Sequence, residues 1–301
     1  MRALIALAIP VAASNLGLML MGLVDLMAVG RLGPEAVSSV GLGVSISAWG
    51  LTIGIGMLGG LDFLASSAWG AGQPHRARTA FQLAWKGVWI FGLPAAGLIA
   101  VSGWLLEGVG IPSEVAVATR SFLVPISLSL LPAWVFQVSR QMLQARQQTR
   151  PVVGSLVLGN VVNVLGNLLW VVGVFGFPSY GIVASAWVTF GARVLMAAVT
   201  LFALYRLDPL VWKKQKTSPQ ERRSIRGELF RMGIPGGLQM GLEVGVFSLS
   251  TILATRLGIM EGAAHQIVLN LVSVTFMVPL GIGQAGAVLV GHAIGAGKRT
   301  L

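Results

Sequence analysis

Long apolar stretches, separated by short polar segments, follow one another along the whole chain. Eight of them reach the roughly 20 apolar residues that an α-helix needs to cross a bilayer core of ~30 Å. They cover residues 3–29, 37–69, 80–106, 122–143, 152–174, 181–204, 232–254 and 263–294. The pattern therefore predicts an all-α, polytopic membrane protein, a helical bundle with eight transmembrane helices.

The segments between the stretches alternate between two kinds. Segments 72–78, 146–150, 206–231 and 298–299 are basic, whereas segments 31–35, 107–114, 175–180 and 256–261 are short and nearly neutral. We assign 17 bases to the first side: Arg2, Arg76, Arg78, Lys86, Arg140, Arg146, Arg150, Arg206, Lys213, Lys214, Lys216, Arg222, Arg223, Arg226, Arg231, Lys298 and Arg299. Because Lys and Arg favour cytoplasmic loops, we predict that both ends of the chain are cytoplasmic.

Composition supports a membrane protein and narrows its chemistry. Hydrophobic residues make up 55% of the 301 residues and charged residues only 10%, against roughly 25% charged in soluble domains. The net charge of +11 is explained by membrane orientation, so we expect membrane lipid and not nucleic acid as a partner. The chain has no Cys, which excludes disulfides and thiolate metal sites.

Short motifs recur 225 residues apart without a gap. Ile9-Pro10 returns as Ile234-Pro235, Arg31-Leu32-Gly33 as Arg256-Leu257-Gly258, and Gly70-Ala71-Gly72 as Gly295-Ala296-Gly297. Six predicted spans separate the copies, so both copies have the same orientation in the membrane. This is a parallel repeat, and a full second copy would give twelve helices in two six-helix repeats.

The repeat predicts three parts in this chain. Residues 1–205 form an N-terminal six-helix bundle, residues 206–231 a basic cytoplasmic linker, and residues 232–301 the first two helices of a C-terminal bundle. We expect that the chain is truncated after its eighth helix. The missing C-terminal helices, or another chain, would then complete the second bundle.

Ionisable residues inside the spans are the candidates for function. Asp25, Asp62, Glu243 and Arg193 lie there, at a cost of at least ~2.5 kcal/mol each on insertion scales, and such residues usually face a bundle interior or a water-filled cavity. Asp25 shares a small, polar helix face with Gly22 and could take up and release a proton. The alternative is a structural pair between Asp25 and Arg193.

Three amides form a stripe in the fifth span. Asn160, Asn163 and Asn167 stand at i, i+3 and i+7, on one face of a helix. Each amide needs partners in hydrocarbon. The stripe is either interhelical glue or part of a site shared with Asp25, where carbonyls and a carboxylate hold a cation or a proton network.

The seventh span offers a second candidate site. Gln239 lies one turn before Glu243, and Pro235, which frees a backbone carbonyl, lies two turns before it. Carboxylate and carbonyl oxygens suit Na⁺ or K⁺, so we predict a candidate Na⁺ site at Glu243 and no other metal or cofactor. Asp62 lies about two turns from the end of its span, where it serves ion coupling or faces a wet vestibule.

The motifs in combination resemble the multidrug and toxic compound extrusion (MATE) family, with Gly241-Leu242-Glu243 closest to its NorM-like branch. The resemblance rests on residues 21–33, 61–72, 233–243, 263–267 and 278–281. It implies two six-helix bundles around a central cavity, in a bacterial inner membrane. It also implies that the protein is not an enzyme but a secondary antiporter, coupled to H⁺ or Na⁺, that exports organic, often cationic drugs by alternating access.

The resemblance assigns roles by position. Asp25 resembles the first-helix acid of the family, Asn163 and Asn167 the polar pair that accompanies it, and Glu243 the seventh-helix acid of a C-terminal cation site. Two alternatives stay open. One is a lipid-linked oligosaccharide flippase of related architecture, although such proteins line their cavity with bases and Arg193 is the one clear intramembrane base in the sequence. The other is a transport-dead truncated remnant.

Overall fold

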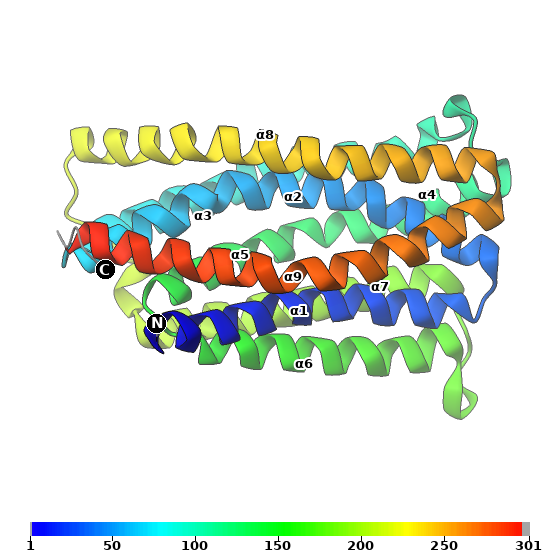
Figure 1. Cartoon of the computed structure of the whole chain (residues 1–301), viewed down its shortest axis with the longest axis horizontal. Coiled ribbons are helices and arrows are strands. Elements are labelled where there is room, and N and C mark those ends of the chain that lie inside the picture. Colours follow the sequence, from blue (N-terminus) through cyan, green and yellow to red (C-terminus); the bar gives the residue numbers. More distant parts are fainter. Residues whose placement is uncertain (1, 297–301) are drawn as a thin grey trace.

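The chain folds into a bundle of long helices that run roughly side by side (Figure 1). The computed structural model describes residues 2–296, apart from the side chains of residues 2–8, 10–12, 14, 18, 292 and 295. The α-helices of this part are α1 (Arg2–Gly30), α2 (Pro34–Gly70), α3 (Pro74–Ser102), α4 (Ser113–Leu128), α5 (Leu130–Ala145), α6 (Arg150–Gly166), α7 (Gly181–Leu207), α8 (Pro219–Leu257) and α9 (Ile259–Gly295). No strand occurs in residues 2–296.

The helices confirm the predicted fold class. Within the described residues, seven helical stretches are long and apolar enough to cross a membrane, and α1 adds a shorter apolar stretch, Asn15–Gly30. One of the seven, Ser113–Ala145, combines α4 and α5, because Ser129 between them keeps helical backbone angles (φ −70°, ψ −11°). The result is the predicted all-α bundle of membrane-spanning helices.

Several helices begin earlier than the apolar pattern predicts. α3 begins at Pro74, α4 at Ser113 and α8 at Pro219, where polar residues still dominate. Pro at the first turn costs no hydrogen bond, and before α8 the Ser218 hydroxyl accepts the backbone N–H of Glu221 at 3.1 Å. Hydropathy reports only the part of a helix that lies in lipid, so residues 219–231 of the predicted linker are helical in the structure.

One of the 17 bases counted for the first side is buried in the bundle. Arg140 lies inside α5, within the apolar stretch Ser113–Ala145 and five residues before the end of the helix. It is only 3% exposed, so it contacts other helices and does not face a loop. Composition does not distinguish a buried base at this position from one that faces a loop.

The chain reversals gather at two ends of the bundle. Figure 1 shows the start of α1 and the end of α9 at the same end, to which α2, α5 and α7 also run. The segments 71–73, 146–149 and 208–218 therefore share that end, and with Arg76 and Arg78 in the first turns of α3 they account for the segments predicted to be basic. We call it the basic end, and the other, with segments 31–33, 103–112 and 173–180, the opposite end.

Helix lengths and contacts reproduce the repeat. α2 and α9 have 37 residues each, and both bounds of α9 lie 225 residues after those of α2. Under the repeat α1 corresponds to α8 and α2 to α9. The structure packs α1 on α9, α2 on α8, and α2 on α9. This exchange of partners is what a twofold repeat axis beside α2 and α9 requires.

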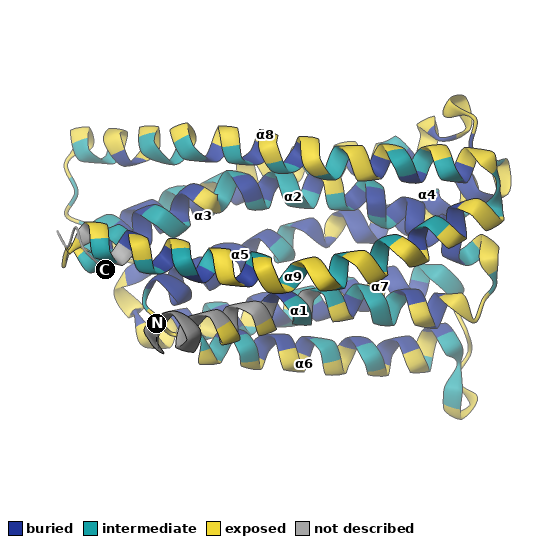
Figure 2. Ribbon diagram, viewed as in Figure 1, coloured by how far each residue is buried: buried dark blue, intermediate teal, exposed yellow. Residues whose placement is uncertain are grey.

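Burial differs sharply between the parts of the bundle. In the apolar 18-residue segment of Ser113–Ala145, 67% of the residues are buried, against 17% in the corresponding segment of α8 and 11% in that of α9. Figure 2 shows the same contrast, with exposed residues along α8 and α9 and buried ones along α5. α5 is thus the centre of the first six spans, whereas α8 and α9 cover one side with a single face each.

Glycine allows α2 and α8 to approach closely. A Cβ atom added to Gly56 of α2 would clash with the backbone carbonyl of Gly236 in α8, and one added to Gly233 with the carbonyl of Met57. Small residues at a membrane helix interface allow this backbone contact. Nearer the opposite end, Trp49 Nε1 donates to the Gly241 carbonyl at 2.8 Å, which extends the contact along both helices.

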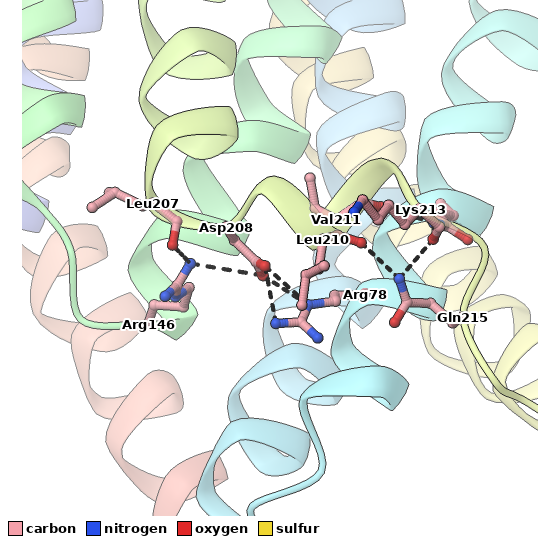
Figure 3. Close-up of polar contacts among 9 residues, drawn as sticks. Arg78, Arg146, Leu207, Asp208, Leu210, Val211, Lys213 and Gln215 are labelled. Atoms are coloured by element: carbon pink, nitrogen blue, oxygen red, sulfur yellow. Dashed lines mark hydrogen bonds and ion pairs between the residues drawn. The ribbon is translucent and has the colours of Figure 1, made fainter.

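A buried ion pair holds the basic end together (Figure 3). Asp208, just after α7, is 2% exposed and accepts from Arg78 of α3, with Nη2 at 2.9 Å from Oδ1. Arg146 of the α5–α6 connection lies 3.7 Å from its other oxygen and donates to the Leu207 carbonyl at 2.9 Å. The indole of Trp69 lies 4.8 Å from the Arg146 guanidinium. Four helices are thereby joined where the predicted linker begins.

We predict that Gly56→Ala destabilises the protein and that Gly59→Ala does not. The Cβ of Gly56→Ala would meet the α8 backbone, whereas a Cβ at Gly59, on the same helix, has nothing within 4 Å. Overpacking of this kind costs about 1–3 kcal/mol. The measurement is the midpoint of thermal unfolding in one detergent. Equal midpoints for the two variants would contradict the close α2/α8 contact.

Candidate functional site

Asp25 of α1 is the acceptor at the centre of a three-helix polar cluster. Its Oδ1 accepts from Asn163 Nδ2 at 2.9 Å and from Asn167 Nδ2 at 2.7 Å. Its Oδ2 accepts from Thr189 Oγ1 of α7 at 2.6 Å. The structure thus brings Asn163 and Asn167 to Asp25, as the hypothesis of a shared site requires, and adds Thr189. The cluster lies near the opposite end, because Asp25 is five residues from the end of α1.

The local fold of α6 positions the two amides. Asn163 and Asn167 are one turn apart and are 0% and 1% exposed. At Asn167 the helix widens into a π-helical turn, Asn167–Val172, a feature that is frequent at functional sites. The amide nitrogens must face Asp25, because amide oxygens would repel a carboxylate. That orientation leaves both amide oxygens buried, with no partner among the described residues.

The arrangement suits a group that binds and releases a cation. Three donors stabilise the negative charge of Asp25, while its enclosure among helices makes that charge costly. A proton on Oδ2 of Asp25 would be donated to the Thr189 hydroxyl, which can accept as well as donate, so this bond would reverse its direction and the negative charge that holds the two amides would be removed. A bare cation needs oxygen ligands, and the unpartnered amide oxygens of Asn163 and Asn167 would supply them at Asp25 once both amides turn. Ion binding at this site would therefore change the contact of α1 with α6 and α7.

The alternative pair between Asp25 and Arg193 is not formed. In the part of the chain that the structure describes, no ion pair joins them, and Arg193 Nη1 instead donates to Ser129 Oγ at 2.6 Å. Arg193 follows Thr189 by one turn of α7, and its charge still acts on Asp25 electrostatically. It therefore places a positive charge beside the cluster without occupying the carboxylate.

Asn160 lies outside the cluster. Its Nδ2 donates to the Gly17 carbonyl of α1 at 2.8 Å and to the Leu156 carbonyl of its own helix at 2.8 Å. The amide stripe is therefore divided: Asn160 joins α1 to α6, as interhelical glue does, and Asn163 and Asn167 hold Asp25.

Glu243 and Gln239 are far from this arrangement. Both side chains are exposed on α8, and neither has a hydrogen bond or ion pair with any described residue. No group of three or more His, Asp or Glu side chains that could hold a metal ion occurs among the residues described. A cation site at Glu243 stays a prediction, to which the present structure adds no further ligand.

Asp62 belongs to a second buried polar cluster, in the half near the basic end. Gln141 Nε2 of α5 donates to its Oδ2 at 3.1 Å, and its Oδ1 has no partner among the described residues. The neighbouring Arg140 donates from Nη2 to Asn15 Oδ1 at 2.8 Å and to Gln284 Oε1 of α9 at 3.1 Å. Asn15 Nδ2 donates to the same Gln284 oxygen at 3.1 Å.

Sequence reasoning missed four of these residues: Thr189, Asn15, Gln141 and Gln284. All four are polar residues within apolar stretches, and that position was the signal available for the three amides. A membrane threonine gives a weaker signal, because its hydroxyl commonly bonds its own helix backbone. Arg140 is a second intramembrane base beside Arg193. The number of intramembrane bases, which was the argument against a flippase, therefore rises from one to two.

Comparison with known proteins gives a consistent similarity over most of the chain. The family model described as MatE matches residues 10–169 and 235–301. The chain is 32% identical to a probable multidrug resistance protein NorM of Caulobacter vibrioides, over 97% of this chain and 62% of the relative. It is 33% identical to the protein of the same name in Pseudomonas putida, over 99% and 65%. The chain therefore spans less than two thirds of the length of these curated relatives.

The fold is similar to that of solved transporters. A eukaryotic MATE transporter, AtDTX14, superposes with a TM-score of 0.85 at 22% identity, over 98% of this chain and 66% of that chain. A transporter of the MOP superfamily from Pyrococcus furiosus gives a TM-score of 0.79 at 19% identity, over 99% and 65%. At these identities the likeness shows a common fold.

We predict that Thr189→Val destabilises the three-helix cluster by about 1–3 kcal/mol, since it leaves Oδ2 of the charged Asp25 without its donor. Thr200→Val is the matched control, because Thr200 is a buried threonine of the same helix whose hydroxyl donates only to carbonyls of α7. Thermal unfolding of the two variants in one detergent measures the difference. If Thr189→Val unfolds no earlier than Thr200→Val, the bond to Asp25 contributes nothing.

Proposed function

The chain belongs to the MatE family, and on that basis we propose that the protein carrying it exports drugs and other organic, often cationic compounds in exchange for H⁺ or Na⁺. Its curated relatives are named as probable multidrug resistance proteins, which supports this class of cargo. The family is one of multidrug transporters and not of enzymes, and the proposal needs no cofactor beyond the coupling ion. Further helices, or another chain, would cover the exposed faces of α8 and α9.

The observation that carries the proposal is the position of Asp25 on α1, a helix of the first bundle that also packs on the second bundle. α1 contacts α6 and α7 through the Asp25 cluster, and along its length it also packs on α9. Alternating access requires one bundle to rock against the other around a fixed site. An ion that binds Asp25 changes the hydrogen bonds that join α1 to α6 and α7. Because α1 also packs on α9 of the second bundle, the change can reach that bundle.

A flippase for lipid-linked oligosaccharides is the alternative, and Arg140 is the observation that bears on it. A cavity for an anionic lipid-linked substrate needs bases that face the cavity. The Arg140 guanidinium is instead enclosed and turned to the amides of Asn15 and Gln284. The drug exporter therefore remains the better supported function.

We predict that Asp25→Asn abolishes gradient-driven efflux. Asparagine keeps the size of the side chain but carries no charge and binds no proton at neutral pH. The protein would be expressed from its complete reading frame and reconstituted in liposomes loaded with a cationic dye, under a pH or Na⁺ gradient. Glu107→Gln, at an exposed acid of the opposite end, is the control and should export normally.

Wild-type efflux by Asp25→Asn, with unchanged dependence on the gradient, would contradict the coupling role of Asp25. A protein that moves no dye even in its wild-type form would match the transport-dead alternative.

We predict that the basic end faces the cytoplasm of a bacterial cell, with the protein in the inner membrane. Reporter fusions after Arg150 and Lys216 should be cytoplasmic, and fusions near Pro112 and Ser179 should not, because Lys and Arg are retained on the cytoplasmic side during insertion. A protease-accessibility assay on spheroplasts gives an independent measurement. The reverse pattern would contradict the topology.

A further inference from the structure

We propose that Arg140, Asn15 and Gln284 form a latch that closes the protein toward the basic end, and that the latch opens in each transport cycle. The inference rests on the proposed transport function. It assigns a positioning role to Arg140 and Gln284, which hold α9 against the first six spans and act on transport through that contact.

The latch is the polar connection of α9 to the first six spans. Among the described residues, every side-chain hydrogen bond between α9 and those spans ends at Gln284 Oε1. The two donors come from different helices, Arg140 from α5 and Asn15 from α1, and Arg140 also bonds Asn15. The three side chains thus close a triangle across the boundary between the parts of the repeat.

Its position suits a gate on one side of the membrane. Gln284 lies eleven residues before the end of α9 and Arg140 five before the end of α5. At 1.5 Å per residue these are roughly 17 Å and 8 Å from the basic end. Asp25 lies ten residues beyond Asn15 on α1, roughly 15 Å further toward the opposite end. One helix therefore carries both the candidate ion site and an arm of the latch.

Two features favour a latch that opens over a permanent joint. The guanidinium of Arg140 has five N–H donors, but its bonds run from Nη2 to neutral amide oxygens, and its Nε has no partner among the described residues. A buried charge held by so few neutral acceptors is weakly fixed. The two hydrogen bonds to Gln284 are the side-chain hydrogen bonds between α9 and the first six spans among the described residues, so separation of α9 breaks few polar bonds.

Asp62 supplies a second acceptor for Arg140. Its Oδ1 is free in the described part of the chain, and it interacts electrostatically with Arg140, although no direct ion pair joins them. Gln141, the next residue of α5, holds the other oxygen of Asp62 in place. When α9 withdraws Gln284, Arg140 can turn to Asp62 and its charge keeps a partner. The opening of the latch is then an exchange of acceptors.

The chain offers a direct reporter for this opening. Ser66 of α2 is fully buried, and its Cβ lies 3.0 Å from the position of a Cβ at Gly291 of α9. Residues 1–301 contain no Cys, so in a protein whose other Cys residues, if any, are replaced by Ser, Ser66→Cys carries one thiol, which a maleimide reaches only after α9 moves away. Labelling is measured on the protein from its complete reading frame, in liposomes and without a gradient.

Gln284→Leu should accelerate labelling of the Ser66→Cys thiol about tenfold or more, the shift expected when hydrogen bonds from a charged donor are lost. Asn270→Leu is the matched control, since its amide donates only to the Gln266 carbonyl of its own helix, and it should leave the rate unchanged. Arg140→Lys, which keeps the charge without the guanidinium fork, should give an intermediate rate.

Two results would overturn the latch. One is an unchanged labelling rate in Gln284→Leu. The other is equal acceleration of a thiol at Ser139, a buried residue of α5 whose hydroxyl bonds its own helix, which would show general loosening instead of movement of α9. Labelling needs no transport, so a failure of the latch is distinguishable from a failure of the exporter. In the latter case Asp25→Asn would transport normally while the labelling pattern still held.

Discussion

The absence of water in a bilayer core constrains this fold more than any other factor, because a buried polar side chain there can bond only to another helix or to its own backbone. Asp25 has three donors from α6 and α7. Asp208 is held by two arginines at the basic end. Arg140 binds amides of α1 and α9. Each group joins helices that are distant in sequence, so these few contacts define which helices are neighbours within an otherwise apolar bundle.

The two polar clusters differ in what they connect. The Asp25 cluster lies wholly within the first six spans, where an ion can alter how α1 is held. The Arg140 cluster crosses to α9, which packs mainly through one face. α1 passes through both, with Asn15 in one and Asp25 in the other, and a continuous helix transmits a shift or rotation along its axis. The same helix therefore connects ion binding near the opposite end to closure near the basic end.

The sequence was most informative where one physical property dominates. Apolar length predicted the spans, and the repeat predicted the equal bounds of α2 and α9. It was less informative where the position of a residue within its helix decides whether the side chain is buried and which residue it contacts. Arg140 stands close enough to a helix end to resemble a loop residue, and Asn160 shares a stripe with Asn163 yet contacts a different part of α1. The glycine contact of α2 with α8 was also missed, because glycine is common in membrane helices and only the packed structure shows which ones meet.

The central claim is that the exchange of coupling ion for cargo depends on Asp25, and ion release on cargo binding tests it most directly. A cationic dye would be added to the detergent-solubilised protein, expressed from its complete reading frame, in weakly buffered solution, with a pH electrode and a Na⁺ electrode as readouts. The account predicts release of H⁺ or Na⁺ by the wild type in proportion to bound dye, and none by Asp25→Asn. Equal release by both proteins would contradict it.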